Sequence, residues 1–275
     1  MILFPNAKIN IGLYITEKRT DGYHNLETIF YPISLTDILE IQKLHNSQRM
    51  FNNTGIQLPG SGEENLCYKA YQLIRQNYTI PEIKIKIHLH KIIPYGSGLG
   101  GGSSDASFTL KALNQLFQLN LGREKLKTLA EQLGSDCPFF IDNAPSFAWE
   151  KGNRNEPVNL SIKGLYILLV VPDIQIDTRT AYQGITPRKR DKSLKDVVLN
   201  EPVENWDKLI TNDFESHIMN LYPLLKQIKQ QLVGKGALFT SLSGSGSAIY
   251  GIFREKPDPG EELNKHFTWV EKLKY

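Results

Sequence analysis

A run of glycines in the first half of the chain most constrains what it can fold into. Five of the seven residues from Gly96 to Gly102 are glycine. So many glycines lower the stability of an ordered region, because each loses unusual backbone freedom on folding. The run lies between a segment that alternates like a strand and a segment spaced like an amphipathic helix. Linkers rarely have such neighbours, so we predict an ordered strand–loop–helix unit.

The segment before the glycines predicts a half-buried strand, because apolar and polar residues alternate along it. The apolar residues are Ile83, Ile85, Ile87 and Leu89, and the polar ones are Lys84, Lys86, His88 and His90. His88 and His90 share the polar face, and their spacing would allow a metal-binding pair. The regular alternation favours a solvated strand face instead, and we predict no metal site there.

Further helix and strand patterns follow the same rules along the rest of the chain. Ala106, Leu110, Leu113 and Phe117 have helical spacing, so we expect a helix that opens near 103–105, where the glycines end. The other expected elements are a half-buried strand over 8–15 with Lys8, Asn10, Gly12 and Tyr14 on its polar face, a helix over 126–133 ended by Gly134, a buried strand over 165–171, a helix over 221–232, and paired strands on either side of 243–247.

Length and composition set the limits on organisation and partners. The 275 residues suffice for two medium domains, and the polar stretch 151–157 places a boundary near residue 155, giving domains 1–155 and 156–275. The formal charge of +3 is too small to predict a nucleic-acid partner. No basic leader or long apolar run begins the chain, so we expect a cytoplasmic protein without membrane association. Cys67 and Cys137 show no metal or disulfide spacing and are expected to be reduced. The charge run 188–192 is expected to be a solvated loop.

The glycine loop has the chemistry of a phosphate site. Glycine lets the backbone approach a ligand closely, and the start of a helix offers unpaired N–H groups with a partial positive charge. The residues expected to hold the phosphates of ATP are Pro94, Tyr95, Gly96, Ser97, Gly98, Leu99, Gly100, Gly101, Gly102, Ser103 and Ser104.

Two known phosphate-loop patterns fit this segment poorly. The Walker pattern fails because Ser103 follows Gly102 where a lysine is required. Gly96, Gly98 and Gly101 match the dinucleotide fingerprint, but any glycine-rich run meets that pattern easily. The loop alone therefore indicates a bound polyphosphate, with ATP favoured and a dinucleotide still open.

Phosphoryl transfer also needs a charge clamp and a group that accepts the proton of the attacking hydroxyl. Lys8 and Asn10 lie on one strand face and could point together into a cleft, although an exposed lysine beside a satisfied asparagine is the alternative. Asp136 follows a helix end and precedes a proline and two aromatic residues. It could be a carboxylate oriented in a site, or equally an N-cap or an Asp turn.

Six segments, in this order along nearly the whole chain, resemble those of the GHMP kinases. They are 7–10 (Ala-Lys-Ile-Asn), 19–24 (Arg-Thr-Asp-Gly-Tyr-His), the glycine loop, 134–139 (Gly-Ser-Asp-Cys-Pro-Phe), 212–215 (Asn-Asp-Phe-Glu) and 243–247 (Ser-Gly-Ser-Gly-Ser). The glycine loop resembles the whole superfamily. The Asp-Gly-Tyr-His run that ends at His24 is narrower and is typical of members whose acceptor alcohol carries a cytidine.

The resemblance implies a two-domain α/β fold, of the α+β GHMP kind, with the active site in the cleft between the domains. It implies that ATP binds the glycine loop and that Lys8 and Asp136 form the catalytic pair. Asp136 would accept the hydroxyl proton, and Lys8 would hold Asp136 and stabilise negative charge. Mg²⁺ is expected with the nucleotide, with no dedicated protein ligand beyond a hydroxyl from Ser104.

The resemblance also implies how an acceptor would be held. The expected substrate is a cytidine diphosphate-linked methylerythritol, phosphorylated on its 2-hydroxyl in the non-mevalonate route to isoprenoids. Tyr23, His24 and Tyr182 match positions that recognise the cytosine, and Asn10 matches one near the reacting hydroxyl. Gly244 and Ser245 match a second glycine motif that lines the cleft, although on sequence alone a tight hairpin turn is favoured.

Two other functions stay open at this point. One is a kinase of the same superfamily that acts on mevalonate, homoserine or a similar alcohol. The other is a nucleotide-binding module without catalysis, which would have no use for Asp136. We expect a monomer or a weak homodimer.

Overall fold

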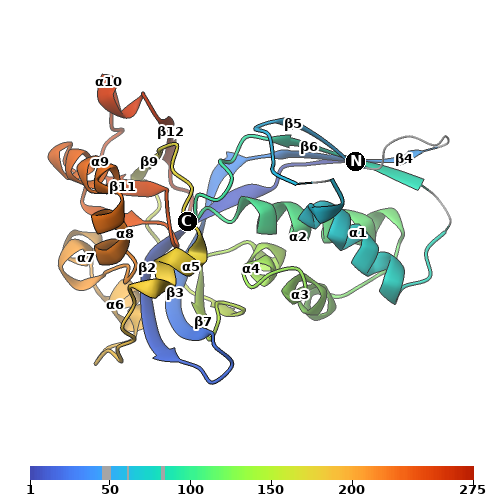
Figure 1. Cartoon of the computed structure of the whole chain (residues 1–275), viewed down its shortest axis with the longest axis horizontal. Helices are drawn as coiled ribbons and strands as arrows, with labels where there is room; N and C mark the ends of the chain where they lie inside the picture. The colour runs from blue at the N-terminus through green and yellow to red at the C-terminus, as the bar shows by residue number, and fades with distance from the viewer. Residues whose placement is uncertain (45–50, 61, 82–83) are drawn as a thin grey trace. The chain divides into compact units, whose positions relative to one another are not determined.

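The computed structural model describes residues 1–44, 51–60, 62–81 and 84–275 (Figure 1). By packing, the chain divides into two compact units. Unit 1 comprises Met1–Ala7, Ser34–Tyr95 and Gly100–Ala144, and unit 2 comprises Lys8–Ile33, Gly96–Leu99 and Pro145–Tyr275. The boundary expected near residue 155 divides the chain into two continuous stretches, 1–155 and 156–275, and it stays a prediction.

Two long strands run through both units, β2 (Asn6–Lys18) and β3 (His24–Thr36). The other elements of unit 1 are β1 (Ile2–Leu3), β4 (Ile38–Leu44), β5 (Phe51–Gly55), the 3₁₀ turn η1 (Gly62–Glu64), α1 (Leu66–Asn77), β6 (Lys84–Lys91), α2 (Gly101–Leu116), α3 (Arg123–Glu131) and α4 (Cys137–Asp142). Those of unit 2 are β7 (Ser146–Trp149), β8 (Arg154–Pro157), β9 (Tyr166–Val171), α5 (Thr178–Gln183), α6 (Leu194–Asn200), α7 (Val203–Leu209), α8 (Glu215–Leu221), α9 (Pro223–Gly234), β10 (Phe239–Leu242), β11 (Ile249–Phe253), α10 (Gly260–Leu263) and β12 (Phe267–Lys272). The chain therefore contains both helices and strands, as expected for an α/β protein of the α+β type.

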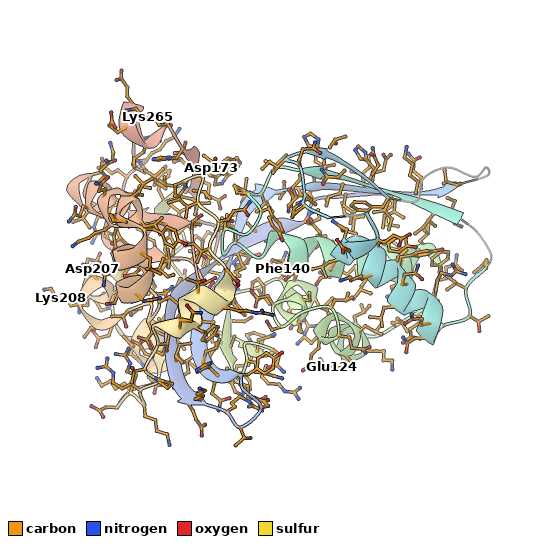
Figure 2. All side chains as sticks on the ribbon, in the orientation of Figure 1. Glu124, Phe140, Asp173, Asp207, Lys208 and Lys265 are labelled. Atoms are coloured by element: carbon orange, nitrogen blue, oxygen red, sulfur yellow. The ribbon has the colours of Figure 1, made fainter. Side chains whose placement is uncertain are left out.

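Unit 1 places helices on one face of a sheet with the strand order β1-β4-β6-β5 (Figure 1). The apolar face of β6 meets β4 in antiparallel register, with Leu89 opposite Leu39 and Ile87 opposite Ile41. The same buried cluster includes Ile74 of α1, and α2 contributes Leu110 and Leu113. Phe140 of α4, labelled in Figure 2, is also fully buried. The expected strand before the glycines is confirmed, and its first residue, Ile83, lies outside the described residues.

The polar face of β6 is half-buried. His88 and His90 both lie within 2.9 Å of the Thr54 hydroxyl of the neighbouring β5. Among the described residues, no group of three His, Cys, Asp or Glu side chains could hold a metal ion.

Unit 2 contains a sheet with the order β10-β11-β9-β12, in which all neighbours are antiparallel. The expected strand over 165–171 is confirmed as β9, and the paired strands around 243–247 are confirmed as β10 and β11. The expected helix over 221–232 is α9, which begins at Pro223. A further sheet has the order β2-β3-β7-β8.

Three expectations differ from the structure in detail. The strand β2 is buried on both faces from Asn6 to Ile15, so the expected half-buried strand is wrong. Its polar face is covered by other residues of unit 2, which a pattern within one strand does not reveal. The helix expected near 103–105 begins earlier, at Gly101, inside the glycine run. The helix expected to end at Gly134 ends at Glu131.

Two further findings bear on the expectations from composition. Cys67 and Cys137 are both free and buried. Within the described ranges, no helix has the length and apolar character needed to cross a membrane.

Candidate active site

The part of the glycine loop that belongs to unit 2 is held against the turn between β10 and β11. The Ser243 hydroxyl donates to the carbonyl of Gly98 (2.9 Å), and the N–H of Ala248 donates to that of Ser97 (3.0 Å). Gly98 has a φ of +79°, and a Cβ atom there would lie 2.0 Å from the Ser243 carbonyl oxygen. Only glycine fits this position, because the two turns touch through their backbones.

Lys8 lies directly against this loop. Its N–H donates to the carbonyl of Leu99 (3.0 Å), and its ammonium donates to the carbonyl of Gly98 (3.2 Å) and to Asn10 Oδ1 (2.5 Å). The Lys8 residue is only 3% exposed, and its ammonium lies 4.9 Å from the centre of the Phe30 ring. The alternative of an exposed strand lysine is therefore wrong. The side chain places a fixed positive charge beside the loop.

Asn10 and Ser243 complete this arrangement. The Asn10 amide group donates to the Thr28 hydroxyl (2.9 Å), which in turn donates to the carbonyl of Gly12 (2.7 Å). These bonds leave Asn10 Oδ1 facing Lys8. The Asn10 backbone N–H donates to the Ser243 hydroxyl (3.2 Å), so Ser243 joins Asn10 to Gly98. This role of Ser243 was not predicted from the sequence, although the residue is the first of the second glycine motif.

The second glycine motif (243–247) is held in place by the polar segment that precedes α8. Asn212 donates to the carbonyls of Leu242 (2.9 Å) and Gly244 (2.8 Å), and its own side-chain oxygen accepts from the N–H of Phe214 (3.0 Å). Gly244 and Ser245 are both half-buried. Together with Ser243, they form a turn with a defined position rather than a loose hairpin end.

In unit 1, the rest of the loop becomes the start of α2. Gly100 precedes the helix with a φ of +69°, and the helix begins at Gly101. A Cβ atom on Gly101 would lie 2.8 Å from the ammonium of Lys91 and 3.0 Å from the side chain of Ile93. The first N–H groups of a helix have no acceptor within it and carry a partial positive charge. This helix start can therefore bind phosphate oxygens.

A buried ion cluster lies behind this helix start. The Lys91 ammonium donates to one oxygen each of Asp37 and Asp105, the latter at 3.0 Å. The other oxygen of Asp37 accepts from the N–H groups of Ile92 (2.6 Å) and Ile93 (2.9 Å). The side chains of the three charged residues are each at most 3% exposed. The cluster thus joins the end of β6, the end of β3 and the first turns of α2.

The two carboxyl groups of this cluster differ in their partners. Asp37 accepts three hydrogen bonds, whereas Asp105 accepts one from Lys91 and its other oxygen is buried without a partner. Burial raises the pKa of Asp105 to about 7, against the lowering effect of the Lys91 charge. Burial would lower the pKa of Lys91, but the Asp105 and Asp37 carboxylates raise it above its ordinary value. Asp105 is therefore the carboxyl group of the cluster that takes up a proton most readily.

A pocket of about 320 Å³ opens in unit 1 beside the glycine loop. Its volume lies within the usual range for small-molecule sites. Its walls combine apolar side chains with a few polar groups, as nucleoside sites do. The lining residues are Leu58, Pro59, Gly60, Glu64, Asn65, Leu66, Lys91, Tyr95, Gly102 and Asp105. Of these, the sequence analysis had named only Tyr95 and Gly102, because the 58–66 segment has no recognisable pattern.

Asp136 belongs to unit 1 and stands immediately before α4. It occupies the N-cap position, but its side chain makes no capping hydrogen bond. The hydroxyl of Ser135 donates to Asp136 Oδ1 (3.3 Å), and the residue is half-buried. The segment is fixed to α2, because the Ser107 hydroxyl lies 2.8 Å from both the Cys137 and the Ser103 carbonyl oxygens. Lys8 belongs to the other unit, and the pairing of Lys8 with Asp136 stays a prediction.

The three aromatic residues expected to recognise a base all lie in unit 2. The His24 and Tyr182 rings stack on each other, with centroids 4.7 Å apart and planes at 19°. The edge of Phe214 supports Tyr182, with centroids 4.9 Å apart. Tyr23 is 61% exposed, and the Lys151 ammonium lies 4.8 Å from the centre of its ring.

The turn before these residues is fixed by Asp21. Its carboxylate accepts from Arg19 Nε (3.1 Å) and from the N–H of Tyr23 (3.1 Å), which lowers its pKa, the bond to Tyr23 being the larger cause. The pKa of His24 is lowered by partial burial and then by the charge of Lys18. A neutral imidazole can both donate and accept a hydrogen bond, as reading a base edge requires.

Ser104 tests whether the helix start suits a metal–nucleotide complex. The residue is fully buried, and its hydroxyl oxygen has no hydrogen-bond partner in the part of the chain that the structure describes. A lone hydroxyl oxygen in the first turn of α2 fits the oxygen ligands or water that Mg²⁺ prefers. The residues present therefore fit magnesium held mainly by a nucleotide.

Comparison with known proteins identifies the family of this chain and several similar proteins. Residues 65–147 match the family model "GHMP kinases N terminal domain", and residues 195–268 match "GHMP kinases C terminal". A 4-diphosphocytidyl-2-C-methyl-D-erythritol kinase of Bacteroides fragilis is 49% identical over 267 residues, which cover 96% of this chain and 95% of that protein.

Two solved structures illustrate the range of the fold. The crystal structure of a 4-(cytidine 5'-diphospho)-2C-methyl-D-erythritol kinase is 30% identical, with a TM-score of 0.83 and full coverage of both chains. A Methanococcus jannaschii mevalonate kinase has a TM-score of 0.70 at 16% identity, covering 100% of this chain and 98% of that one, a likeness in fold alone. This chain belongs to the GHMP kinases and, within them, to the family of the 4-diphosphocytidyl-2-C-methyl-D-erythritol kinases.

Proposed function

We propose that this chain is an ATP-dependent kinase that phosphorylates the 2-hydroxyl of 4-diphosphocytidyl-2-C-methyl-D-erythritol, in the methylerythritol phosphate route to isoprenoids. The observation that carries the proposal is the 49% identity, over 96% of the chain, to a kinase named for this substrate. The geometry of the glycine loop supports it: within unit 2, Lys8 and Ser243 bond to the carbonyl of Gly98, and within unit 1 the start of α2 offers N–H groups to phosphate oxygens.

The nucleotide would be held by unit 1 through two features. The phosphates would accept from the first N–H groups of α2, and the nucleoside would occupy the pocket beside Tyr95 and Gly102. Ser104 would supply a hydroxyl to Mg²⁺ or to one of its waters. Magnesium, when bound, would offset the charge of the phosphates.

The transfer itself needs a proton acceptor and a positive charge near the phosphates. The substrate hydroxyl oxygen would form a bond to the γ-phosphorus while the bond from that phosphorus to the leaving oxygen of ADP breaks. Asp136 would accept the hydroxyl proton, and Lys8 would stabilise the negative charge that is spread over the transferred group. The contacts of Lys8 with Gly98 and Asn10 support this role, because they hold its ammonium in one place.

The cytidine end would be recognised by Tyr23, His24 and Tyr182. The stack of His24 on Tyr182 already fills the face that a base would use. Binding would therefore require His24 to leave this face, after which its ring nitrogens could reach the base edge. Phe214 would keep Tyr182 in place during the exchange.

The cellular setting is proposed along with the activity. A soluble substrate of this kind and the composition of the chain favour a cytoplasmic enzyme. A monomer or weak homodimer stays our expectation.

An assay of ADP release tests the function. The purified protein is offered ATP and Mg²⁺ with the cytidine compound, mevalonate or homoserine. We expect turnover of the cytidine compound at least about a hundred times faster, in kcat/KM, than of the other two. Turnover of mevalonate or homoserine without the cytidine compound would overturn the substrate proposal.

The same assay tests the role of Asp136. Asp136→Asn should lower kcat by about two to four orders of magnitude and leave the KM for ATP within about threefold, because the amide keeps the shape but cannot accept the proton. Ser135→Ala is the matched control, since it removes the neighbouring hydroxyl and keeps the carboxylate. Near-normal kcat in Asp136→Asn would mean that Asp136 is structural.

A further inference from the structure

The segment 212–215 (Asn-Asp-Phe-Glu) joins several elements of unit 2, although its sequence pattern alone assigns it no function. Its backbone lies beside β2 in a short parallel bridge between Leu13 and Asn212. The N–H of Leu13 donates to the carbonyl of Thr211 (3.0 Å), and the N–H of Asp213 donates to the carbonyl of Leu13 (2.8 Å). The backbone is thus bonded to β2 on both sides of Asn212.

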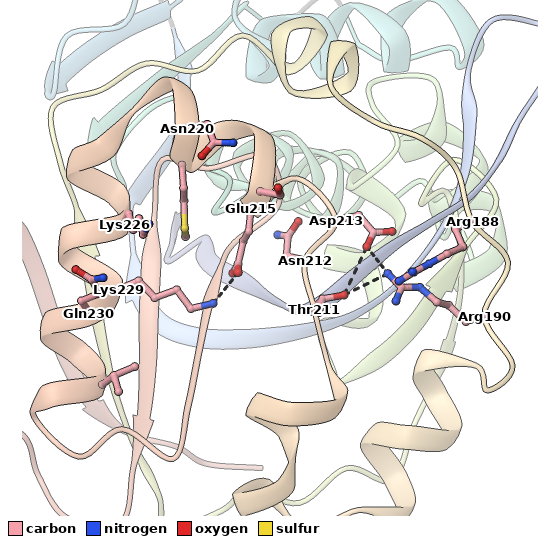
Figure 3. A pocket seen from close by; sticks show the side chains of 13 residues that line it. Arg188, Arg190, Thr211, Asn212, Asp213, Glu215, Asn220, Lys226, Lys229 and Gln230 are labelled. Atoms are coloured by element: carbon pink, nitrogen blue, oxygen red, sulfur yellow. Dashed lines mark hydrogen bonds and ion pairs between the residues drawn. The ribbon is translucent and has the colours of Figure 1, made fainter.

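Two carboxylates anchor the same segment, and Figure 3 shows their ion pairs. Each accepts from one backbone N–H and from one cationic side chain. Asp213 is paired with the N–H of Ile15 (2.8 Å) and with Arg190, and Glu215 is paired with the N–H of Leu242 (2.7 Å) and with Lys229 (2.6 Å). These anchors reach β2, β10 and α9, so the place of Asn212 between them does not depend on its own side chain.

The side-chain amide of Asn212 uses both of its hydrogens and its oxygen. The residue is only 2% exposed, and its Nδ2 atom donates to the carbonyls of Leu242 (2.9 Å) and Gly244 (2.8 Å). Its Oδ1 atom accepts from the N–H of Phe214 (3.0 Å). An aspartate or a leucine of the same size could not make all three bonds, because only a primary amide combines two such donors with an acceptor.

The donor end of Asn212 holds the second glycine motif against the phosphate loop. A Cβ atom on Gly244 would lie 3.4 Å from the carbonyl oxygen of Gly98, and the neighbouring Ser243 hydroxyl donates to that carbonyl (2.9 Å). The Lys8 ammonium donates to the same carbonyl (3.2 Å). A displacement of Gly244 would therefore move the loop carbonyl that orients Lys8.

The acceptor end of Asn212 holds the support of the base-stacking ring. Phe214 presents its edge to Tyr182, with ring planes at 84°. The helix α5, which carries Tyr182, also packs on α8 at Gly184, where a Cβ atom would lie only 2.1 Å from the His217 ring. The segment that begins at Asn212 therefore determines where the Tyr182 ring lies.

From these contacts we propose that Asn212 is a positioning residue for both ligands of the kinase. Its Nδ2 atom sets the second glycine motif and, through it, the 96–99 part of the phosphate loop. Its Oδ1 atom sets Phe214 and, through it, the Tyr182 ring that would face the cytosine. The inference rests on the proposed function, and it adds that the two ends of one buried side chain serve two different ligands.

Exchanging only the donor end of the amide separates the two roles. Asn212→Asp keeps the shape and an oxygen that faces the N–H of Phe214, but its second oxygen cannot donate to the carbonyls of Leu242 and Gly244. It should weaken binding of a non-hydrolysable ATP analogue with Mg²⁺ by about tenfold or more, and leave binding of 4-diphosphocytidyl-2-C-methyl-D-erythritol within about threefold. Titration calorimetry with each ligand alone measures both affinities without turnover.

Phe214→Leu acts on the other end alone. It removes the ring edge from Tyr182, so it should weaken binding of the cytidine compound by about three- to tenfold and leave binding of the ATP analogue within about twofold. Asn212→Ala loses both ends and should weaken binding of both ligands.

Ile228→Val is the matched control, because Ile228 is an apolar residue in the buried cluster of the same unit. It should lower thermal stability and leave both affinities within about twofold. Loss of stability alone is thereby separated from loss of position.

Chemical modification of His24 reports on the Tyr182 end without any ligand. The rate of its reaction with diethyl pyrocarbonate, followed by mass spectrometry, should rise in Phe214→Leu and Asn212→Ala, because both loosen the ring on which His24 stacks. The rate should stay unchanged in Asn212→Asp, which keeps the bond to Phe214.

The proposed function and this inference fail in different ways. An unchanged protein that binds the ATP analogue but not the cytidine compound contradicts the substrate, and the ATP analogue and the His24 rate then still decide the role of Asn212. Equal weakening of both ligands in Asn212→Asp, unchanged binding of the ATP analogue in that variant, or an equal loss of both affinities in Phe214→Leu would each overturn the inference. Weakening of only one ligand in Asn212→Ala, which introduces no charge, would overturn it as well.

Discussion

Asp105 shows most clearly how a single residue in this chain departs from its ordinary behaviour. It lies in the first turns of α2, buried with Lys91 and Asp37, and its pKa is raised to about 7 from an ordinary value of 3.8, chiefly by burial. Besides Lys91 and Asp37, the Cys67 thiol is a titratable neighbour, and burial keeps it protonated by raising its pKa. The proton on Asp105 therefore controls the net charge of the cluster behind the phosphate-binding helix start.

Stability should depend on pH through this residue. Between about pH 4 and pH 7 the folded protein binds a proton at Asp105 that the unfolded chain releases, so the free energy of unfolding falls as the pH rises through this range. The unchanged protein should lose about 1–3 kcal/mol more than Asp105→Asn between pH 5 and pH 8, because asparagine does not titrate. Urea unfolding at several pH values measures this difference.

Asp37→Asn is the contrasting variant. It removes a carboxylate that accepts three hydrogen bonds, so it should lower stability at every pH. Because the Asp37 charge helps to raise the pKa of Asp105, the variant should also show a shallower pH slope than the unchanged protein. Parallel curves for the unchanged protein and Asp105→Asn would mean that Asp105 keeps an ordinary pKa.

The sequence predicts which residues share a strand face, but it does not predict what surrounds them. Lys8 and Asn10 were expected on one strand face, and they do bond to each other. Alternation within β2 predicted that this face meets solvent, but it is buried by residues far along the chain, such as Ser243. A periodic pattern reports on one strand and carries no information on which distant segment covers its polar face.

At the scale of the elements, the sequence predicted that the glycine loop leads into a helix, but it predicted the wrong first residue for that helix. Counting apolar spacing placed the helix start near 103–105, because the glycines contribute no side chains to the pattern. The helix begins at Gly101, whose missing side chain makes room for Lys91. The sequence could predict a strand, a loop and a helix, while the exact boundary depends on a contact with β6.

Substitutions in the loop should separate backbone strain from close packing. Gly98→Ala combines a φ of +79° with a collision against the Ser243 carbonyl, so it should cost about 2–4 kcal/mol of stability and lower kcat/KM at least about tenfold. Gly96→Ala is the control, because its φ of +66° is similar but no atom lies within 4 Å of the added Cβ. It should cost about 1 kcal/mol.

Thermal unfolding and ADP release measure both effects. Equal losses in the two variants would show that the left-handed backbone, rather than the contact with Ser243, decides the tolerance of the loop.

At the scale of the whole molecule, the segments that pack into one unit are not continuous in the sequence. Residues 8–33 precede most of unit 1 in sequence but belong to unit 2. Leu13, Ile15 and Leu26 from β2 and β3 share a buried cluster with Leu168 and Val170 of β9. Composition and a polar stretch near residue 155 could not reveal this, because both describe neighbours along the chain.

This arrangement predicts how the protein behaves when it is produced as two separate fragments. A fragment of residues 156–275 lacks the strands that complete its core, so it should not unfold cooperatively and should bind a hydrophobic dye. Mixing it with a fragment of residues 1–155 should restore cooperative unfolding and helical content. Circular dichroism and dye fluorescence measure both states. Cooperative unfolding of the isolated 156–275 fragment would contradict the prediction.

The stacked rings of His24 and Tyr182 also provide a spectroscopic signal for ligand binding. Circulating electrons in an aromatic ring shield any nucleus held above its face, and His24 lies over Tyr182 with planes only 19° apart. The carbon-bound protons of the imidazole should therefore resonate upfield of their usual positions in a magnetic resonance spectrum. A ligand that separates the rings would move these signals downfield, and Phe214→Leu, which loosens the support of Tyr182, should broaden them.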